Sequence, residues 1–354
     1  MKRLGGKGII IILLVSLLLV GCGGGNNKAA NEGNENTSNN TVNTENGNNE
    51  AEASEENVQV KIGILQLAEH IALDRAREGF EEELKSQGID AGIDLVNAQG
   101  DLSLTSTAPK KFIESDVDII YAIATPAAQG ALNAIGDKDI PLIFNAVTDP
   151  VAAGLVESME KPGGNVTGVS DYFSTEEQLD GFMKAFPEMK TIGVLYSTDE
   201  ANSQVQVDEL KELTEKKGLK LETVGVSSVN DVPTAMTSLV NKIDGFFCIT
   251  DNLAANSATI IGDMLAEKKI PSFAAEQGPV EMGLLMTDGV DYKALGHEAG
   301  KIAAKMIKDK TPAGEIPVLR ATESKKVVNE SVAERMELDI NSDIFEGAEK
   351  VKLK

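Results

Sequence analysis

Two stretches of the chain repeat each other at nearly one spacing. Lys61–Leu65 (KIGIL) matches Thr191–Leu195 (TIGVL) about 130 positions later, and Asp118–Thr125 matches Asp244–Asp251 at almost the same offset. A helical pattern and an Ile-Pro pair follow the second block of each half. Because one α/β lobe needs about 100–150 residues, the repeat predicts two lobes of the same topology.

From Val58 onward, short β-branched runs alternate with helical patterns, which is typical of parallel sheets covered by helices. The fold class is therefore predicted as α/β. Strands are expected at residues 60–66, 92–97, 119–124, 142–145, 166–169, 191–196, 221–226, 245–250, 272–275 and 284–287. Helices are expected over Ala72–Gln87 and Asn202–Lys217, each followed by a glycine that suits a helix end. A last strand and a short helix are expected within residues 323–354.

The first 22 residues combine a basic start with an apolar run of 13 residues, too short to span a bilayer. The run ends in Leu-Val-Gly-Cys, which resembles the lipobox of bacterial lipoproteins. That resemblance implies a signal peptide over residues 1–22, an acylated Cys22 and a lipid anchor on the extracytoplasmic face of the cell membrane. The alternative is a plain N-terminal membrane helix.

Residues 23–57 are a low-complexity stretch of Gly, Asn, Glu, Thr and Ser that cannot bury enough apolar surface to order its backbone. We therefore expect a disordered tether between an anchor and a folded domain; a tail without a role is the alternative. The whole chain carries a formal net charge of −23, which disfavours nucleic-acid binding.

The chain offers few residues for metal or nucleophilic chemistry. It contains two His and two Cys, and Cys248 lies in an apolar run that favours a buried core position over a reactive thiol. The sequence shows neither a Gly-x-Ser-x-Gly elbow nor a Gly-x-Gly-x-x-Gly turn after the first strand. No cofactor and no metal are expected, and an exported enzyme using Asp171, Glu276 or the Glu69–His70 pair is a weak alternative.

In open parallel sheets, ligands bind outside the carboxyl ends of the strands. Two facing lobes bring two such edges to one cleft, and the residues after the strands are the candidates for ligand contact. The predicted ligand-binding residues are Gln66, Thr125, Ala127, Asn145, Thr148, Asp171, Asn202, Ser203, Asp251, Asn252 and Glu276.

These residue types suit a zwitterion such as an amino acid. A carboxylate could meet the helix start at Thr125 and Ala127, or the one at Asn202 and Ser203. Three acids, with Asp171 as the first choice, could accept hydrogen bonds from an ammonium group. No Arg or Lys stands at a strand end, as a dianion would need.

Several candidates have a structural alternative. Thr125 and Asp251 could simply cap helices, and Asp149 before a proline favours a turn. An aromatic or apolar pocket could be formed by Leu67, Tyr172, Phe173 and Tyr196, although core packing explains them as well. The Glu69–His70 pair favours a helix start that shapes the cleft, and His297 is expected on a helix surface.

Six segments stand in the order found in one family: residues 60–66, 123–129, 145–156, 162–171, 200–203 and 250–252. Together they resemble ABC transporter substrate-binding proteins of the tryptophan/tyrosine-binding type. The resemblance implies a type I periplasmic-binding fold with two Rossmann-like lobes joined by crossover strands. It places residues 58–168 and about 288–320 in the N-terminal lobe, and residues 169–287 and about 321–354 in the C-terminal lobe.

The same resemblance implies a monomeric lipoprotein that closes on a small molecule, such as an amino acid, and delivers it to the permease subunits of an ABC importer. An exported sensory receptor domain with the same fold remains the alternative.

Overall fold

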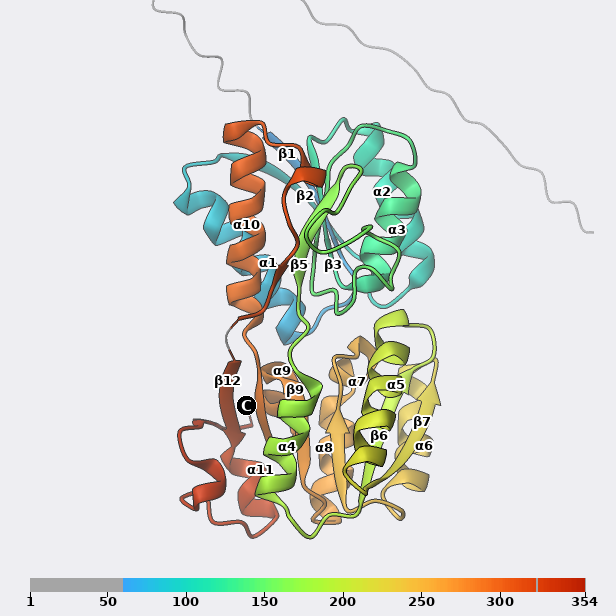
Figure 1. Cartoon of the computed structure of the whole chain (residues 1–354), viewed down its shortest axis with the longest axis vertical. Helices are drawn as coiled ribbons and strands as arrows, with labels where there is room; N and C mark the ends of the chain where they lie inside the picture. Colours follow the sequence, from blue (N-terminus) through green and yellow to red (C-terminus); the bar gives the residue numbers. More distant parts are fainter. Residues whose placement is uncertain (1–59, 323, 354) are drawn as a thin grey trace, which may run out of the picture. The chain divides into compact units, whose positions relative to one another are not determined.

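The computed structural model describes residues 60–322 and 324–353. The signal peptide with Cys22 and the tether over residues 23–57 lie outside the described residues, so both stay predictions. Within the described part, no helix has the length and apolar character that a membrane crossing requires. The strands of this part form two sheets, each with helices packed against it (Figure 1).

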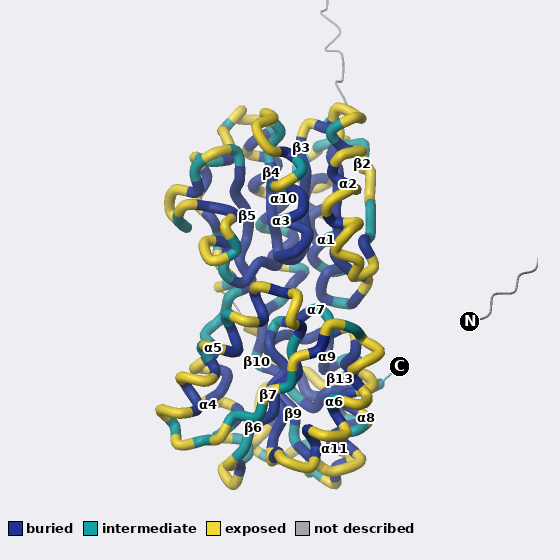
Figure 2. Tube along the Cα trace, turned by 90° about the vertical axis from the view of Figure 1, so that its right-hand side faces the viewer, coloured by how far each residue is buried: buried dark blue, intermediate teal, exposed yellow. Residues whose placement is uncertain are grey.

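The first sheet has the strand order β11-β5-β4-β3-β1-β2, and every neighbouring pair is parallel. Its central strands are buried, whereas β2 at the edge is largely accessible (Figure 2). The strands are β1 (Val60–Gln66), β2 (Ala91–Asn97), β3 (Ile119–Ile123), β4 (Leu142–Asn145), β5 (Val166–Ser170) and β11 (Leu319–Arg320).

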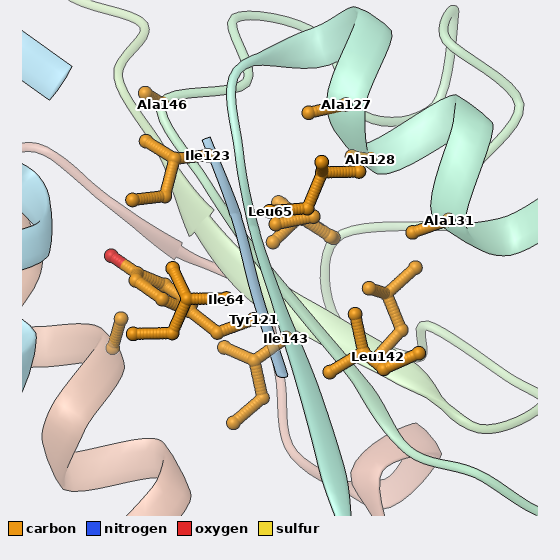
Figure 3. Packing of buried hydrophobic residues seen from close by; sticks show 14 of the residues in the cluster. Ile64, Leu65, Tyr121, Ile123, Ala127, Ala128, Ala131, Leu142, Ile143 and Ala146 are labelled. Carbon is orange, nitrogen blue, oxygen red and sulfur yellow. The ribbon is translucent and has the colours of Figure 1, made fainter. Parts of the chain in front are cut away.

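Helices cover both faces of this sheet because successive strand side chains point to opposite sides. Leu65 points toward α3, whereas Ile64 lies on the other face with Tyr121 (Figure 3). Helices α2 (Leu102–Glu114) and α3 (Thr125–Ile135) pack together on one face, and α1 (Ile71–Ser86) packs on α10 (Tyr292–Asp309) on the other.

The close approach of α1 and α10 depends on two glycines. A Cβ atom on Gly79 would lie 2.2 Å from the carbonyl oxygen of Lys293, and one on Gly296 would lie 2.2 Å from that of Ala76. The backbones of α1 and α10 therefore pack directly on each other. This contact holds α10, which lies late in the sequence, in the first lobe.

The second sheet has the order β13-β12-β10-β9-β8-β6-β7, with only the β10–β12 pair antiparallel. Its strands are β6 (Thr191–Ser197), β7 (Lys220–Val226), β8 (Gly245–Cys248), β9 (Ser272–Glu276), β10 (Met286–Val290), β12 (Ser324–Asn329) and β13 (Glu349–Val351). Its helices are α4 (Thr175–Ala185), α5 (Ala201–Lys216), α6 (Val232–Leu239), α7 (Asn252–Asn256), α8 (Ala258–Glu267), α9 (Gln277–Met282) and α11 (Glu330–Arg335).

The chain passes between the two lobes after β5, after β10 and between β11 and β12. This is the α/β fold predicted from the repeats, with two mostly parallel sheets joined by crossover segments. The lobe limits expected at residues 168 and 288 fall inside β5 and β10, because each strand continues to the point where the chain leaves its sheet.

All ten expected strands and both expected helices are present, with ends that coincide or differ by at most three residues. The largest shift is at β10, which begins at Met286 rather than Leu284 because the preceding residues follow the end of α9. The expected last strand and helix are β12 and α11. The sequence pattern missed β11 and β13, which are two and three residues long.

Candidate functional site

A small cavity of about 20 Å³ lies between residues of the two lobes, near the carboxyl ends of the strands. That volume accommodates roughly one water molecule. It is lined by His70, Ala146, Asp171, Asn202, Ile249, Thr250, Asp251, Asn252, Ala255, Glu276 and Tyr292. Five of the predicted ligand-binding residues, which span more than one hundred positions of sequence, are therefore brought together here.

Asp171 directly follows β5, where the chain leaves the first lobe. Its side chain is buried, and its Oδ2 accepts a 2.6 Å hydrogen bond from the hydroxyl of Tyr292. Its Oδ1 is buried and has no hydrogen-bond partner among the described residues. Burial raises the pKa of Asp171, while the hydroxyl groups of Tyr292 and Thr148 oppose that shift.

Glu276 ends β9 and caps the short helix α9 by accepting a hydrogen bond from the backbone N–H of Gly278. Its Oε1 is buried and meets no donor from the described part of the chain. Burial raises the pKa of Glu276 to about 8, and the Gly278 N–H and the charge of Arg75 offset part of that shift.

Asn202, the second residue of α5, is also incompletely bonded. Its Nδ2 donates to the carbonyl oxygen of Thr250 at 2.9 Å, but its Oδ1 is buried without a partner within residues 60–322 and 324–353. Asp171, Asn202 and Glu276, three of the residues that line the small cavity, therefore each keep one acceptor oxygen without a donor from the described residues. Buried acceptors of this kind are rare and call for an explanation.

Asp251, in contrast, is fully bonded. It caps α7 through Ala254 N and accepts from Ser197 N at 2.6 Å and from the hydroxyl of Ser203 at 2.7 Å. The cap interpretation of Asp251 is confirmed. The Ser203 hydroxyl donates its hydrogen bond to the same carboxylate. The Asp251 carboxylate therefore connects the end of β6, the first turn of α5 and helix α7.

Glu200, which precedes α5, is a buried carboxylate that sequence reasoning missed. Its Oε2 accepts from the amide groups of Asn202 and Asn252. Burial, together with the charge of Asp251, raises the pKa of Glu200 to about 8. Its position three residues after β6, among the polar residues that follow the strands, was a signal for it in the sequence.

Direct contacts join the two lobes around the cavity. His70 Nε2 lies 3.2 Å from Asn252 Oδ1, and the hydroxyl oxygens of Thr148 and Thr250 are also 3.2 Å apart. Burial lowers the pKa of His70, which favours the neutral imidazole. His70 therefore shapes the cleft, as expected.

A charged contact closes one side of the cleft. Arg75 of α1 makes two hydrogen bonds to Glu281 of α9, at 2.7 and 3.1 Å, and both side chains are largely shielded from solvent. This ion pair joins the lobes and lies outside the set of residues that line the cavity.

The other predicted residues serve the first lobe. The Gln66 amide donates to Ala68 O and Asp74, which fixes the turn into α1. Asn145 donates to the hydroxyl of Tyr121 and accepts from Ala146 N. Asp149 accepts from two backbone N–H groups of its own turn, which confirms the turn interpretation.

Thr125 and Ala127 do not line the cavity, and Thr125 is not a helix cap. Helix α3 already begins at Thr125, and Ala124 occupies the cap position with a φ of 85°. Helix α3 begins one residue earlier than a cap at Thr125 would require. The Thr125 side chain is therefore packed inside the lobe. Ala146, another alanine with positive φ, reaches the cavity instead.

A larger pocket of about 270 Å³ lies beside the small cavity, and Asn252 lines both. Its walls come from both lobes and mix apolar with hydroxyl and amide groups. They are Leu67, Ala68, Gln99, Gly100, Leu102, Ser197, Asp199, Glu200, Ser227, Ser228, Val229, Asn252, Leu253 and Asn256. Volumes near this size are typical of small-molecule sites.

The aromatic candidates lie elsewhere. Tyr172 and Phe173 border a void of about 10 Å³ next to Asp171, together with Thr148. Tyr172 donates to Glu209, and Tyr196 packs on the core of the second lobe. Of the four expected pocket residues, Leu67 alone lines the larger pocket.

The described residues contain no cluster of three His, Cys, Asp or Glu side chains that could hold a metal ion. Cys248 is fully buried in the second lobe, and burial raises the pKa of its thiol. His297 lies half-buried on α10 beside Glu82 and Glu83 rather than on an open surface, because α10 packs closely on α1.

Comparison with known proteins matches residues 61–352 to the family model "ABC transporter substrate binding protein". A protein of Clostridioides difficile (strain R20291) named "Tyrosine-binding protein" is 42% identical over 297 residues, which are 83% of this chain and 85% of that protein. The solved complex of an ABC domain from Streptococcus pneumonia with L-Trp is 34% identical, with a TM-score of 0.78 over 83% of this chain and 99% of that one.

A third relative is the ligand-free, open structure of a substrate-binding protein with adhesive properties from Clostridium difficile. It is 43% identical and covers 83% of this chain and 100% of that one, but its TM-score is only 0.64. The more similar sequence thus superposes less well than the L-Trp complex. The described residues are arranged more like the ligand-bound relative than like the open one.

Proposed function

This chain belongs to the family of ABC transporter substrate-binding proteins, and on that basis we propose that it captures an α-amino acid, with an aromatic side chain, through its primary ammonium group. Its relatives include a protein named for tyrosine and one solved with L-Trp. The site chemistry supports the same class of ligand, because the cavity presents acceptors and the candidate ligand brings donors.

The observation that carries the proposal is the set of unpartnered oxygens: Asp171 Oδ1, Asn202 Oδ1 and Glu276 Oε1. A primary ammonium group has three N–H donors. A cavity of about 20 Å³ has room for a group of the size of water, which an ammonium matches. The ammonium would satisfy all three acceptors, and the carboxylates would balance its charge.

The rest of the ligand would occupy the larger pocket of about 270 Å³. Leu67, Leu102 and Leu253 offer apolar contact for a ring, while the hydroxyl groups of Ser197 and Ser228 suit a polar end. Capture would require the lobes to separate and then close again, since His70 and Asn252 are in contact across the site. The chain would bind its ligand without converting it.

Thermal unfolding of the purified protein tests this proposal. L-tyrosine, L-tryptophan and L-phenylalanine would be compared with sugars, nucleosides and N-acetyl-L-tryptophan, in which the amine is blocked. A ligand at one hundred times its dissociation constant should add about 2.7 kcal/mol of stability. Stabilisation by the free amino acids but not by the N-acetyl derivative is expected. A shift with sugars alone would refute the amine assignment.

We further propose that the protein is a monomeric lipoprotein, anchored at Cys22 on the extracytoplasmic face of the membrane, which delivers its ligand to an ABC permease. The lipobox and the tether of the sequence support this role. Replacing Cys22 with Ser should move the protein from the membrane fraction to the soluble fraction. Deleting the gene should reduce uptake of the radiolabelled ligand, and normal uptake would contradict the importer role.

A further inference from the structure

The side-chain hydrogen-bonding groups left over at the site are all acceptors. Asp171, Asn202 and Glu276 line the small cavity, and each keeps one buried oxygen without a donor from the described residues. No side-chain donor that lines either cavity is left buried without an acceptor in the same part of the chain. Because the described arrangement is more like the L-Trp complex than like the open relative, a bound molecule has to bring donors here.

The start of helix α7 already carries two carboxylates of the protein itself. Glu200 accepts hydrogen bonds from the backbone N–H groups of Asn252 and Leu253. Asp251 accepts one from the N–H of Ala254. Free N–H groups at a helix start are a common place for a bound carboxylate. At α7 these groups are in use, so they are not open to a carboxylate of the ligand.

The other helices that begin at the small cavity also have acids at their starts. Glu200 precedes α5, Glu276 precedes α9 and Asp291 precedes α10. Glu276 and Asp291 accept hydrogen bonds from backbone N–H groups in the first turns that follow them. Helix α1 begins after His70 and carries Asp74 in its first turn. The positive ends of these helices therefore have negative side chains of the protein beside them.

The linings of the two cavities combine many acids with few bases. Five acidic side chains line the small cavity or the larger pocket: Asp171, Asp199, Glu200, Asp251 and Glu276. The described lining residues include one histidine, His70, and no Lys or Arg. Arg75 of α1 lies outside this lining and is bonded to Glu281. A further negative group would therefore enter a site that already holds an excess of negative charge.

An α-amino acid brings such a group with it. Its carboxylate carbon lies roughly 2.5 Å from the ammonium nitrogen, because one carbon atom separates them. An ammonium group bound by Asp171, Asn202 and Glu276 therefore places the ligand carboxylate close to the same acids. The ammonium also favours the ionised forms of these acids, which accept hydrogen bonds and donate none. The site thus attracts the ammonium group and repels the carboxylate.

We propose that the site also binds aromatic primary amines that lack the carboxylate, the decarboxylated counterparts of aromatic amino acids. Such a monocation brings the same three N–H donors and the same ring as the amino acid. It has a net charge one unit more positive, which suits a lining rich in acids. Tryptamine and tyramine belong to this class. This inference rests on the amino-acid binding proposed above and extends its ligand class from zwitterions to monocations.

Isothermal titration calorimetry of the full-length protein tests the inference with two matched sets of probes. One set is L-tryptophan, tryptamine and indole-3-propionate, and the other is L-tyrosine, tyramine and 3-(4-hydroxyphenyl)propionate. We expect each amine to bind at least as tightly as its amino acid. The two acids without an amine should bind about a hundredfold more weakly or not at all, since they lack the charged donors.

Two variants separate charge from shape. Asp171→Asn and Glu276→Gln each remove a negative charge that attracts both ligands through the ammonium but repels only the amino acid. The amine should therefore lose more affinity than the amino acid, by about fivefold or more in the ratio of their dissociation constants. Glu222→Gln, at a carboxylate paired with Lys220 on the edge strand β7, should leave that ratio unchanged. The unaltered protein decides the matter where a variant does not fold.

The possible failures are distinguishable. A larger dissociation constant for an amine than for its amino acid would overturn this inference and leave the amino-acid proposal standing, because the carboxylate would then contribute to recognition. Binding of none of the four probes that carry an amine would overturn the proposed function and this inference with it. Binding of the amines alone would support this inference and contradict the choice of an amino acid as ligand.

Discussion

The hydroxyl of Tyr292 donates a 2.6 Å hydrogen bond to Oδ2 of Asp171, across 121 positions of sequence. Asp171 follows β5 and Tyr292 begins α10, so the bond joins two of the points where the chain passes between the lobes. It fixes one oxygen of a carboxylate that lines the small cavity.

Replacing Tyr292 with Phe should destabilise the protein by about 1–3 kcal/mol at pH 8, because a buried acceptor loses its donor. Amino-acid affinity should fall as well, since Asp171 would no longer be held in place. Urea denaturation and calorimetry would measure the two effects. Tyr196→Phe is the control, because that hydroxyl makes no hydrogen bond to other described residues. Equal losses in both variants would contradict a special role for the Tyr292–Asp171 bond.

Glu276 should make the ligand-free protein less stable as pH rises. Its pKa is raised from 4.5 to about 8 in the folded protein, so the folded state binds more protons than the unfolded state between these values. Stability should be greatest below pH 4.5 for this group and decline toward pH 8, by up to about 1.4 kcal/mol per pH unit.

The Glu276→Gln variant should flatten that decline and be more stable than the unaltered protein at pH 8, with little difference near pH 5. Urea midpoints at pH 5, 6.5 and 8 would show this. A pH profile unchanged by the substitution would mean that Glu276 is ionised in the ligand-free protein.

The Arg75–Glu281 ion pair should favour the closed arrangement of the lobes without touching the ligand. Arg75→Gln and Glu281→Gln should each weaken binding about three- to tenfold, by the same factor for every ligand. The double variant should lose little more than either single one, because the two side chains act as a pair. In this double-mutant cycle, calorimetry would measure the dissociation constants of the unaltered protein, the two single variants and the double variant.

Arg77→Gln provides a matched control for the cycle. Arg77 pairs with Glu81 at 2.7 Å on the same helix, with comparable exposure, but the pair lies within one lobe. Its removal should leave ligand affinity unchanged. An equal loss of affinity in Arg77→Gln would show that the effect comes from helix α1 and not from the contact between lobes.

Ala146 lines the small cavity with a φ of 57°, a left-handed conformation that costs a non-glycine residue about 1–2 kcal/mol. Ala146→Gly should therefore stabilise the protein by about 0.5–1 kcal/mol. Ala255→Gly, in helix α7 beside the same cavity, should instead cost about 0.5–1 kcal/mol. Thermal unfolding of both variants would check these opposite signs, and a loss of stability in Ala146→Gly would show that the alanine methyl group is needed for packing.

The sequence alone determined the architecture and part of the local chemistry. Strand and helix patterns depend on residues close in the chain, so these patterns predicted ten strands and the limits of α1 and α5 within one or two residues. The repeats predicted the two lobes. The burial of Cys248 and the turn at Asp149 were predicted for the same reason, and the cap at Asp251 was one of two alternatives that the local pattern left open. Each depends on a few neighbouring residues.

Only the tertiary structure decided which strand-end side chains meet. Gln66 and Asn145 occupy equivalent strand ends to Glu276, yet they bond within their own lobe, while Glu276 and Asp171 line the cavity and each keep a buried oxygen without a donor from the described residues. The direction of a side chain at a strand end depends on the turn that follows and on the helix packed beside it. The convergence of Tyr292, His70 and Arg75 depends on how helices from distant parts of the chain pack, and a local sequence pattern does not record that packing.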